Sequence, residues 1–215
     1  MQILIAGLVA AALLLLLPRF LGRRQERMLK EYEVLEKRFG LTRRVSKSRW
    51  GKGIGERYSL FGENRGYPLS LYSHFVGKGR EKRVWTSLTL EVLFVEDLEL
   101  CVEFSATDSV SRFTLNEALE RLPVLEGVEL RCSEVEFASI VLQEPIAARL
   151  RSLARQPTCG AIRLNKGFLE YREAGTMDEE SQRIRFQEAI LLLAALADAL
   201  SVYFSERKKS EAAAL

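Results

Sequence analysis

The opening segment of the chain, ILIAGLVAAALLLLLPRFLGRR, constrains its fold more than any other part of the sequence. No charged or strongly polar side chain occurs from Ile3 to Pro18. A helix of that length spans about 24 Å, and Phe20 and Leu21 extend it toward the roughly 30 Å hydrocarbon core of a bilayer. The polar residues that punctuate a surface helix of a globular domain are missing here. Residues 1–22 are therefore predicted to be a transmembrane anchor.

A cleaved export signal is the main alternative for this segment. Such a signal has a basic region before its apolar run and a small-x-small cleavage site after it. Here Met1 and Gln2 precede the run and Pro18-Arg19-Phe20 follows it, which makes a poor cleavage site. We therefore expect the segment to be retained in the membrane.

Charge sets the expected orientation of the anchor. Five basic residues follow it closely, and no Lys or Arg precedes it. The positive-inside rule then places the rest of the chain in the cytoplasm. The same five side chains are the candidate membrane-surface contacts, because an anionic leaflet attracts each nearby Lys or Arg by about 1 kcal/mol. They are Arg19, Arg23, Arg24, Arg27 and Lys30.

The net charge of +3 conceals two oppositely charged parts. The stretch Arg19–Arg83 holds 18 basic and 7 acidic side chains, whereas Val84–Leu215 holds 14 basic and 22 acidic ones. A solvated basic surface that merely satisfies the orientation rule is an equal alternative to direct contact with lipid. Nucleic acid is not an expected partner, because no basic helix or basic–aromatic motif stands out.

A helix is predicted directly after the anchor, over residues 23–40. Four apolar side chains recur at helical spacing and form one stripe. Two heptads are too few to predict a coiled coil, so we expect this stripe to pack on the chain's own domain. The stripe consists of Met28, Tyr32, Leu35 and Phe39.

The middle of the chain is predicted to form an antiparallel sheet. Apolar side chains alternate over Tyr67–Phe75, and again over Leu88–Phe94 and Leu98–Phe104 on either side of a turn near Asp97. Two adjacent alternating runs are typical of a meander with one face in water. The side chains expected on that wet face are Glu91, Glu99 and Glu103.

The rest of the chain completes a single α+β domain over residues 41–206, followed by a flexible tail over 207–215. The last helix is apolar nearly all round, so a second membrane span has to be considered. Asp198 interrupts its apolar run, and a crossing would place Arg207 outside, against the charge rule. We expect it to pack in the core or at a partner interface. The other predicted elements are a short helix over Thr114–Leu122, a strand over Glu134–Leu142, a helix with Pro145 at its first position, a hairpin turning at Asn165-Lys166-Gly167, and the last helix over 178–206.

No cofactor, metal site or catalytic residue is predicted. His74 is the single histidine, and Cys101, Cys132 and Cys159 form no metal-binding or redox motif. The run Gly51–Gly55 lacks the spacing of a phosphate-binding loop and indicates a turn. Carboxylates are plentiful, yet acid–base catalysis requires two of them in one desolvated cleft.

Several motifs resemble a loose group of uncharacterised bacterial membrane-anchored proteins. The likeness lies in Arg57–Gly62, Arg65–Leu69, Gly77–Gly79 and Trp85–Leu90. The resemblance implies a bacterial inner membrane and an anchor followed by a helix, a glycine-punctuated β region and a terminal helix. It implies no activity and no site residue.

The sequence therefore favours a single-pass inner-membrane protein whose cytoplasmic domain binds a partner or acts as a scaffold. One alternative is a tethered enzyme whose carboxylates and arginines converge only in three dimensions. The other is a structural subunit of a membrane complex that docks a protein partner through its C-terminal helix.

Overall fold

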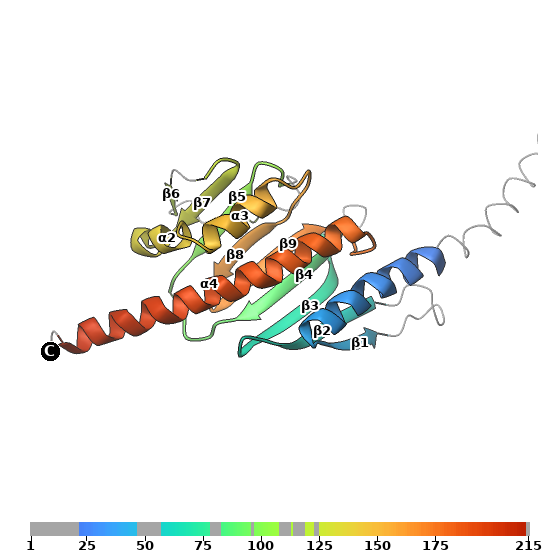
Figure 1. The fold of residues 1–215 in the computed structure, drawn as a ribbon, viewed down its shortest axis with the longest axis horizontal. Helices are drawn as coiled ribbons and strands as arrows, with labels where there is room; N and C mark the ends of the chain where they lie inside the picture. The colour runs from blue at the N-terminus through green and yellow to red at the C-terminus, as the bar shows by residue number, and fades with distance from the viewer. Residues whose placement is uncertain are drawn as a thin grey trace, which may run out of the picture.

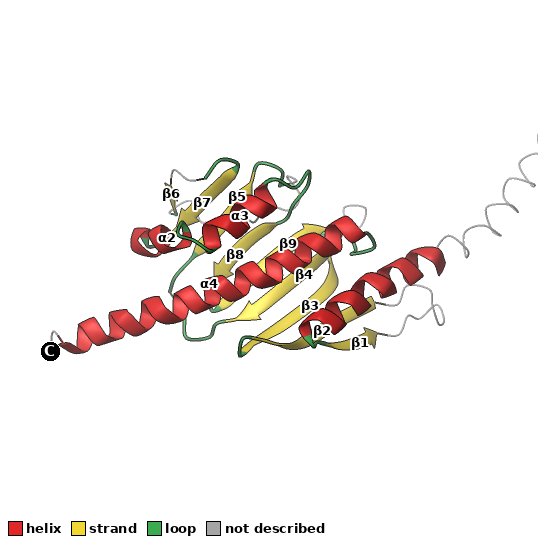
Figure 2. Ribbon diagram, in the orientation of Figure 1, coloured by secondary structure: helices red, strands yellow, loops and turns green. Residues whose placement is uncertain are grey.

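The computed structural model describes residues 22–46, 57–77, 83–95, 97–107, 113, 119–122 and 125–213. Residues 1–21 lie outside these ranges. They include Arg19 and all of the predicted anchor except Gly22. The glycine-rich run 51–55 also lies outside them. The described part is an α+β domain in which helices cross one face of a large antiparallel sheet (Figures 1 and 2). The α+β class, the antiparallel pairing and the long C-terminal helix packed on the sheet are confirmed.

The sheet has nine strands in the order β1-β2-β3-β4-β9-β8-β5-β7-β6, and each neighbouring pair is antiparallel. The strands are β1 (Thr42–Ser46), β2 (Arg57–Asn64), β3 (Tyr67–Val76), β4 (Arg83–Glu91), β5 (Leu100–Phe104), β6 (Glu120–Leu122), β7 (Val128–Cys132), β8 (Ala161–Asn165) and β9 (Phe168–Ala174).

Four helices accompany the sheet in the described part of the chain. A first helix occupies residues 22–39, and its apolar stripe faces the sheet, with Tyr32 and Leu35 buried in the core. The others are α2 (Val135–Val141), α3 (Ile146–Ala154) and α4 (Glu180–Ala213). Figure 1 shows the first helix, α3 and α4 on the same side of the sheet, with α4 running along the domain and projecting beyond it at its C-terminal end.

The predicted meander of β4 and β5 is wrong, because β9 and β8 lie between these strands. After β4 the chain turns beside the β8–β9 hairpin, where the backbone N–H of Val92 donates to the carbonyl of Gly167 at 2.7 Å. β5 is also buried on both faces rather than wet on one, and Glu103 is only 9% exposed. The hairpin turn itself is confirmed, with Lys166 and Gly167 both at positive φ, as a tight hairpin turn requires.

Two other secondary-structure predictions are corrected. The stretch predicted as a strand over Glu134–Leu142 forms helix α2, since its buried residues Phe137, Ala138 and Val141 have helical rather than alternating spacing. Residues 120–122, predicted to end a short helix, form strand β6 instead. Short apolar runs are ambiguous between helix and strand when periodicity is the only signal.

Helix α4 is the one helix in the described ranges that is long and apolar enough to cross a membrane by length and composition. Its apolar side chains nevertheless contact the sheet and α3, and Leu192, Leu196 and Leu200 are fully buried. The expectation of a core helix therefore agrees with the packing. The helix continues to Ala213, so the predicted flexible tail is helical up to that residue.

Candidate functional site

The first helix is fastened to the beginning of α4 by polar contacts along its length. Arg24 Nε lies 2.7 Å from Asp178 Oδ2, and Arg183 Nε lies 2.8 Å from Glu31 Oε2. The Glu31–Arg183 pair is nearly buried, with side-chain exposures of 10% and 12%. At the C-terminal end of the first helix, Arg38 donates to Gln187 at 3.2 Å. This helix is therefore part of the domain rather than a loose connection to it.

The outward face of the same helix carries three of the predicted membrane-contact residues. Arg23, Arg27 and Lys30 are exposed and, together with Glu26, line an open surface hollow of about 530 Å³. Their spacing of four and three residues places them on one helical face. Arg24 lies on another face, where Asp178 and the hydroxyl of Thr176 hold its guanidinium. The structure thus groups three of the five predicted residues and separates Arg24 from them, while Arg19 lies outside the described residues.

A second hollow, of about 180 Å³, lies between the first helix and the ends of strands β2, β3 and β4. We call it the helix–sheet hollow. Its lining is mainly apolar, with arginine side chains among the polar groups. The lining residues are Arg24, Gln25, Met28, Tyr32, Arg57, Tyr58, Ser73, His74, Phe75, Val84 and Thr176.

Two side chains that line the helix–sheet hollow, Tyr32 and Ser73, belong to a chain of hydrogen-bonded hydroxyl groups. The hydroxyls of Tyr32 and Ser73 are 3.3 Å apart, and those of Ser73 and Thr86 are 3.0 Å apart. Thr86 in turn donates to the carbonyl of Gly175 at 2.8 Å. Burial raises the pKa of Tyr32 to about 12, so this phenol stays neutral at physiological pH. These hydroxyls satisfy one another, which makes them a structural wall rather than a nucleophile and base.

Carboxylate and guanidinium groups do converge in three dimensions at one buried place. Glu173 and Arg185 pair between β9 and α4, and the hydroxyl of Tyr171 also donates to Glu173. Burial and the adjacent Glu173 carboxylate raise the pKa of Tyr171 well above its usual value. Because both Glu173 oxygens already accept hydrogen bonds and neither partner lines any hollow described here, this cluster serves stability better than catalysis.

The single histidine and the cysteines offer no further chemistry. Burial lowers the pKa of His74, so its imidazole is neutral at physiological pH. The thiols of Cys101, Cys132 and Cys159 are free and buried, and burial raises the pKa of each. Over the part of the chain that the structure describes, no group of three or more His, Cys, Asp or Glu side chains has a geometry that could hold a metal ion.

The C-terminal part of α4 is the one place where that helix has unburied side chains along several turns. Residues 205–213 are all exposed, and an open hollow of about 640 Å³ separates this projection from α2. Glu134 at the start of α2 bridges it, accepting from Tyr203 at 2.6 Å and from Arg207 at 2.9 Å. A protein partner at α4 remains a prediction. Leu192 and Leu196 on this helix are buried against the domain itself.

Sequence reasoning missed a stack of arginine and aromatic side chains on the sheet face opposite α4. The guanidinium carbon of Arg172 lies 4.7 Å from the ring centroid of Trp85 and 3.7 Å from that of Phe113. Arg163 lies 4.6 Å from the same Phe113 ring. Arg163 and Arg172 come from neighbouring strands and Phe113 from a distant loop, so no local spacing signals the stack.

Comparison with known proteins adds little. No protein-family model matches the chain, and no curated protein matches it. Among solved structures, the chain is similar to the crystal structure of the mycobacterial trehalose monomycolate transport factor A, TtfA, with 14% sequence identity and a TM-score of 0.49. The match covers 85% of this chain and 95% of that one. At these values the likeness carries no argument about function.

Proposed function

We propose that this chain is a membrane-anchored, non-catalytic binding or scaffold module held at the cytoplasmic face of a bacterial inner membrane. In this proposal the exposed face of the first helix, formed by Arg23, Arg27 and Lys30, contacts the anionic leaflet. The acidic remainder of the domain faces the cytoplasm and its partner.

The observation that carries the proposal is that the first helix has an exposed cationic face and, opposite it, a face buried in the core. One face presents three cations to solvent with Glu26 as the acidic neighbour in the same hollow. The other face is bound to the core by Tyr32 and Leu35. Three cations near an anionic surface contribute up to about 3 kcal/mol, an attraction that salt weakens within a Debye length.

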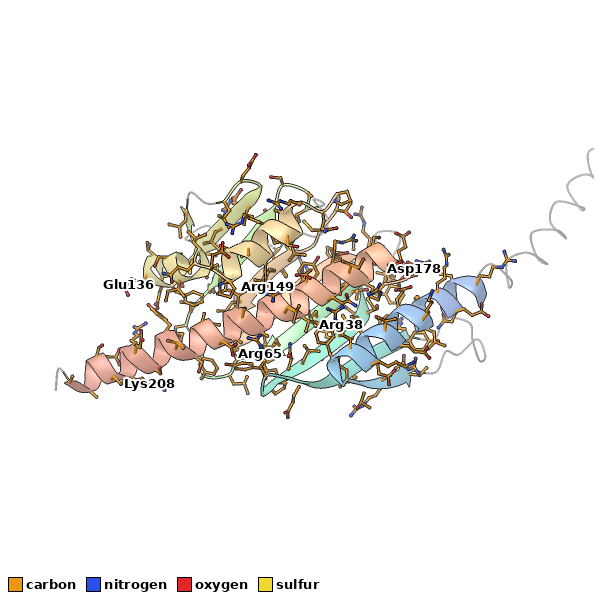
Figure 3. The ribbon with its side chains drawn as sticks, viewed as in Figure 1. Arg38, Arg65, Glu136, Arg149, Asp178 and Lys208 are labelled. Atoms are coloured by element: carbon orange, nitrogen blue, oxygen red, sulfur yellow. The ribbon has the colours of Figure 1, made fainter. Side chains whose placement is uncertain are left out.

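Lysine footprinting of the full chain tests this contact. The protein is reconstituted in nanodiscs of phosphatidylcholine, with or without phosphatidylglycerol, and treated with an amine-reactive reagent. We expect the anionic lipid to slow modification of Lys30 several-fold and high salt to abolish the protection. Lys208 and its neighbour Lys209 serve as internal controls, because Lys208 lies at the opposite end of the molecule from Asp178 and the first helix (Figure 3).

Equal modification of Lys30 in neutral and anionic nanodiscs would contradict the proposed contact with the leaflet. Equal protection of Lys30, Lys208 and Lys209 would also contradict it, since a general effect of the lipid does not require this helix face. A double variant, R23Q/R27Q, keeps Lys30 as the probe and should reduce its salt-sensitive protection by the anionic lipid. The control variant R151Q/R155Q makes the same change in net charge elsewhere in the domain and should leave the protection of Lys30 unaffected.

A further inference from the structure

The helix–sheet hollow has the chemistry of a site for an amphiphile. Its walls include the apolar side chains of Met28, Phe75 and Val84 and the ring of Tyr58. Phe75 is 41% exposed, which is high for a phenylalanine that forms the wall of a hollow. The volume of about 180 Å³ is slightly larger than a cavity of about 150 Å³ that holds benzene. A short stretch of hydrocarbon therefore fits.

The two charged side chains that line the hollow, Arg24 and Arg57, are both cationic. The guanidinium carbon of Arg57 lies 4.3 Å from the centroid of the Phe75 ring, and among the described residues no carboxylate lies within ion-pair distance of it. Arg24 uses Nε and Nη2 for Asp178 and Thr176. Its Nη1 has no partner in the described part of the chain. Two arginines beside an apolar wall complement a ligand with a hydrocarbon part and an anionic head.

The position of the hollow indicates where such a ligand comes from. Arg24, Gln25, Met28 and Tyr32 lie on the first two to three turns of the described helix, directly after the apolar segment that we propose to be the anchor. At a rise of about 1.5 Å per residue, these lining residues lie within about 15 Å of the end of the proposed anchor, a distance over which a lipid of the adjacent leaflet can place its headgroup in the hollow. The inference therefore rests on the proposed function.

We propose that the helix–sheet hollow binds one anionic lipid of the leaflet, with a segment of its acyl chain against Met28, Phe75 and Val84 and its headgroup on Arg24 and Arg57. The exposed face of Arg23, Arg27 and Lys30 attracts the bilayer surface as a whole, whereas the hollow takes a single lipid molecule. The domain would then sense or present an individual lipid.

Photocrosslinking of the full chain in phosphatidylcholine nanodiscs tests the proposal. The nanodiscs contain a trace of either phosphatidic acid or phosphatidylcholine with a diazirine on the acyl chain, and the crosslinked residues are identified by mass spectrometry. We expect crosslinks at Met28, Phe75 or Val84 to be at least fivefold more frequent with the phosphatidic acid probe. Crosslinks confined to residues 1–21, or equally frequent with both probes, would overturn the proposal.

Two variants separate the acyl site from the headgroup site. Val84→Trp fills the hollow and should abolish these crosslinks, and Arg57→Gln should reduce the preference for the anionic probe toward unity. Val202→Trp and Arg155→Gln are the matched controls, because both positions are exposed and lie outside the hollow. Thermal unfolding establishes which variants fold. If Val84→Trp does not fold, the test rests on Arg57→Gln. A lost preference for the anionic probe in Arg57→Gln supports the proposal, and an unchanged preference overturns it.

The source of the ligand and the proposed leaflet contact are tested apart. Soluble decanoate that competes fully with the phosphatidic acid probe would assign the hollow to a free fatty acid and overturn the lipid assignment. Protection of Lys30 without crosslinks in the hollow would refute this inference and leave the proposed function standing. If neither protection of Lys30 nor crosslinks in the hollow are observed, the proposed function and this inference are both refuted.

Discussion

Glu173 on β9 and Arg185 on α4 form a two-pronged ion pair inside the domain. Nε of Arg185 donates to Oε1 at 2.8 Å, and Nη2 donates to Oε2 at 2.9 Å. The two side chains are only 6% and 8% exposed. The pair joins the long helix α4 to a central strand of the sheet, so it fixes how α4 lies across that face.

Breaking this pair should destabilise the domain more than breaking an exposed one. Glu173→Gln leaves the Arg185 charge buried without its counter-ion, which costs about 3 to 5 kcal/mol of unfolding free energy. Asp198→Asn breaks the Arg65–Asp198 pair, whose side chains are 52% and 45% exposed, and should cost less than about 1 kcal/mol. Denaturant unfolding of the full chain in mild detergent measures both. Similar losses of unfolding free energy in the two variants would contradict a larger contribution of the buried pair.

A close backbone approach predicts a strong effect of a single methyl group at Gly160. A Cβ built there lies 2.1 Å from the carbonyl oxygen of Arg172, on the backbone of β9. Gly160→Ala must therefore displace a central strand. We expect it to lower the free energy of unfolding by about 1 to 3 kcal/mol.

Gly22→Ala is the control for this substitution. No atom lies within 4 Å of a Cβ at Gly22, and the residue is helical. Alanine should there be neutral or stabilise by up to about 1 kcal/mol. Comparing the two unfolding free energies separates the close contact from a general effect of replacing glycine, and equal values would contradict the geometry.

These examples show which parts of the fold local sequence signals can reveal. The turn at Lys166-Gly167 was predictable, because a tight hairpin needs residues at positive φ and an adjacent glycine supplies one. The order of the strands was not, since β9 pairs with β4 through contacts between residues about 80 positions apart. Helix α2 was mistaken for a strand because a seven-residue run contains too few turns to show a helical period.

The candidate site was also predictable from the sequence only in part. The run of basic residues after the apolar segment was enough to select Arg23, Arg24, Arg27 and Lys30. It could not reveal that Arg24 pairs with Asp178, because 154 residues separate the two and nothing in either local sequence indicates the contact. The helix–sheet hollow escapes sequence reasoning for the same reason, as its walls come from one helix, three strands and the loop before α4.

The three thiols should be unreactive in the folded protein. Burial raises the pKa of Cys101 to about 12 and that of Cys159 to about 11, and it also raises the pKa of Cys132. The reactive thiolate is therefore scarce at pH 8, and the buried sulfurs are hidden from reagent. Ellman's reagent should label less than one thiol per chain before unfolding and three in guanidinium chloride. Fast labelling of the native chain would contradict the burial.

Alkaline pH should weaken the domain through Tyr32. Its folded pKa of about 12 lies above the usual value of 10, because burial disfavours the phenolate. Between these two values the unfolded chain loses this proton while the folded chain keeps it, so stability is fully present below pH 10 and falls as pH rises toward 12. A difference of about 2 pKa units corresponds to about 2 to 3 kcal/mol. Unfolding free energies measured from pH 9 to 12 should therefore fall less steeply for Tyr32→Phe than for the unmodified chain, and parallel curves would show that Tyr32 ionises equally in both states.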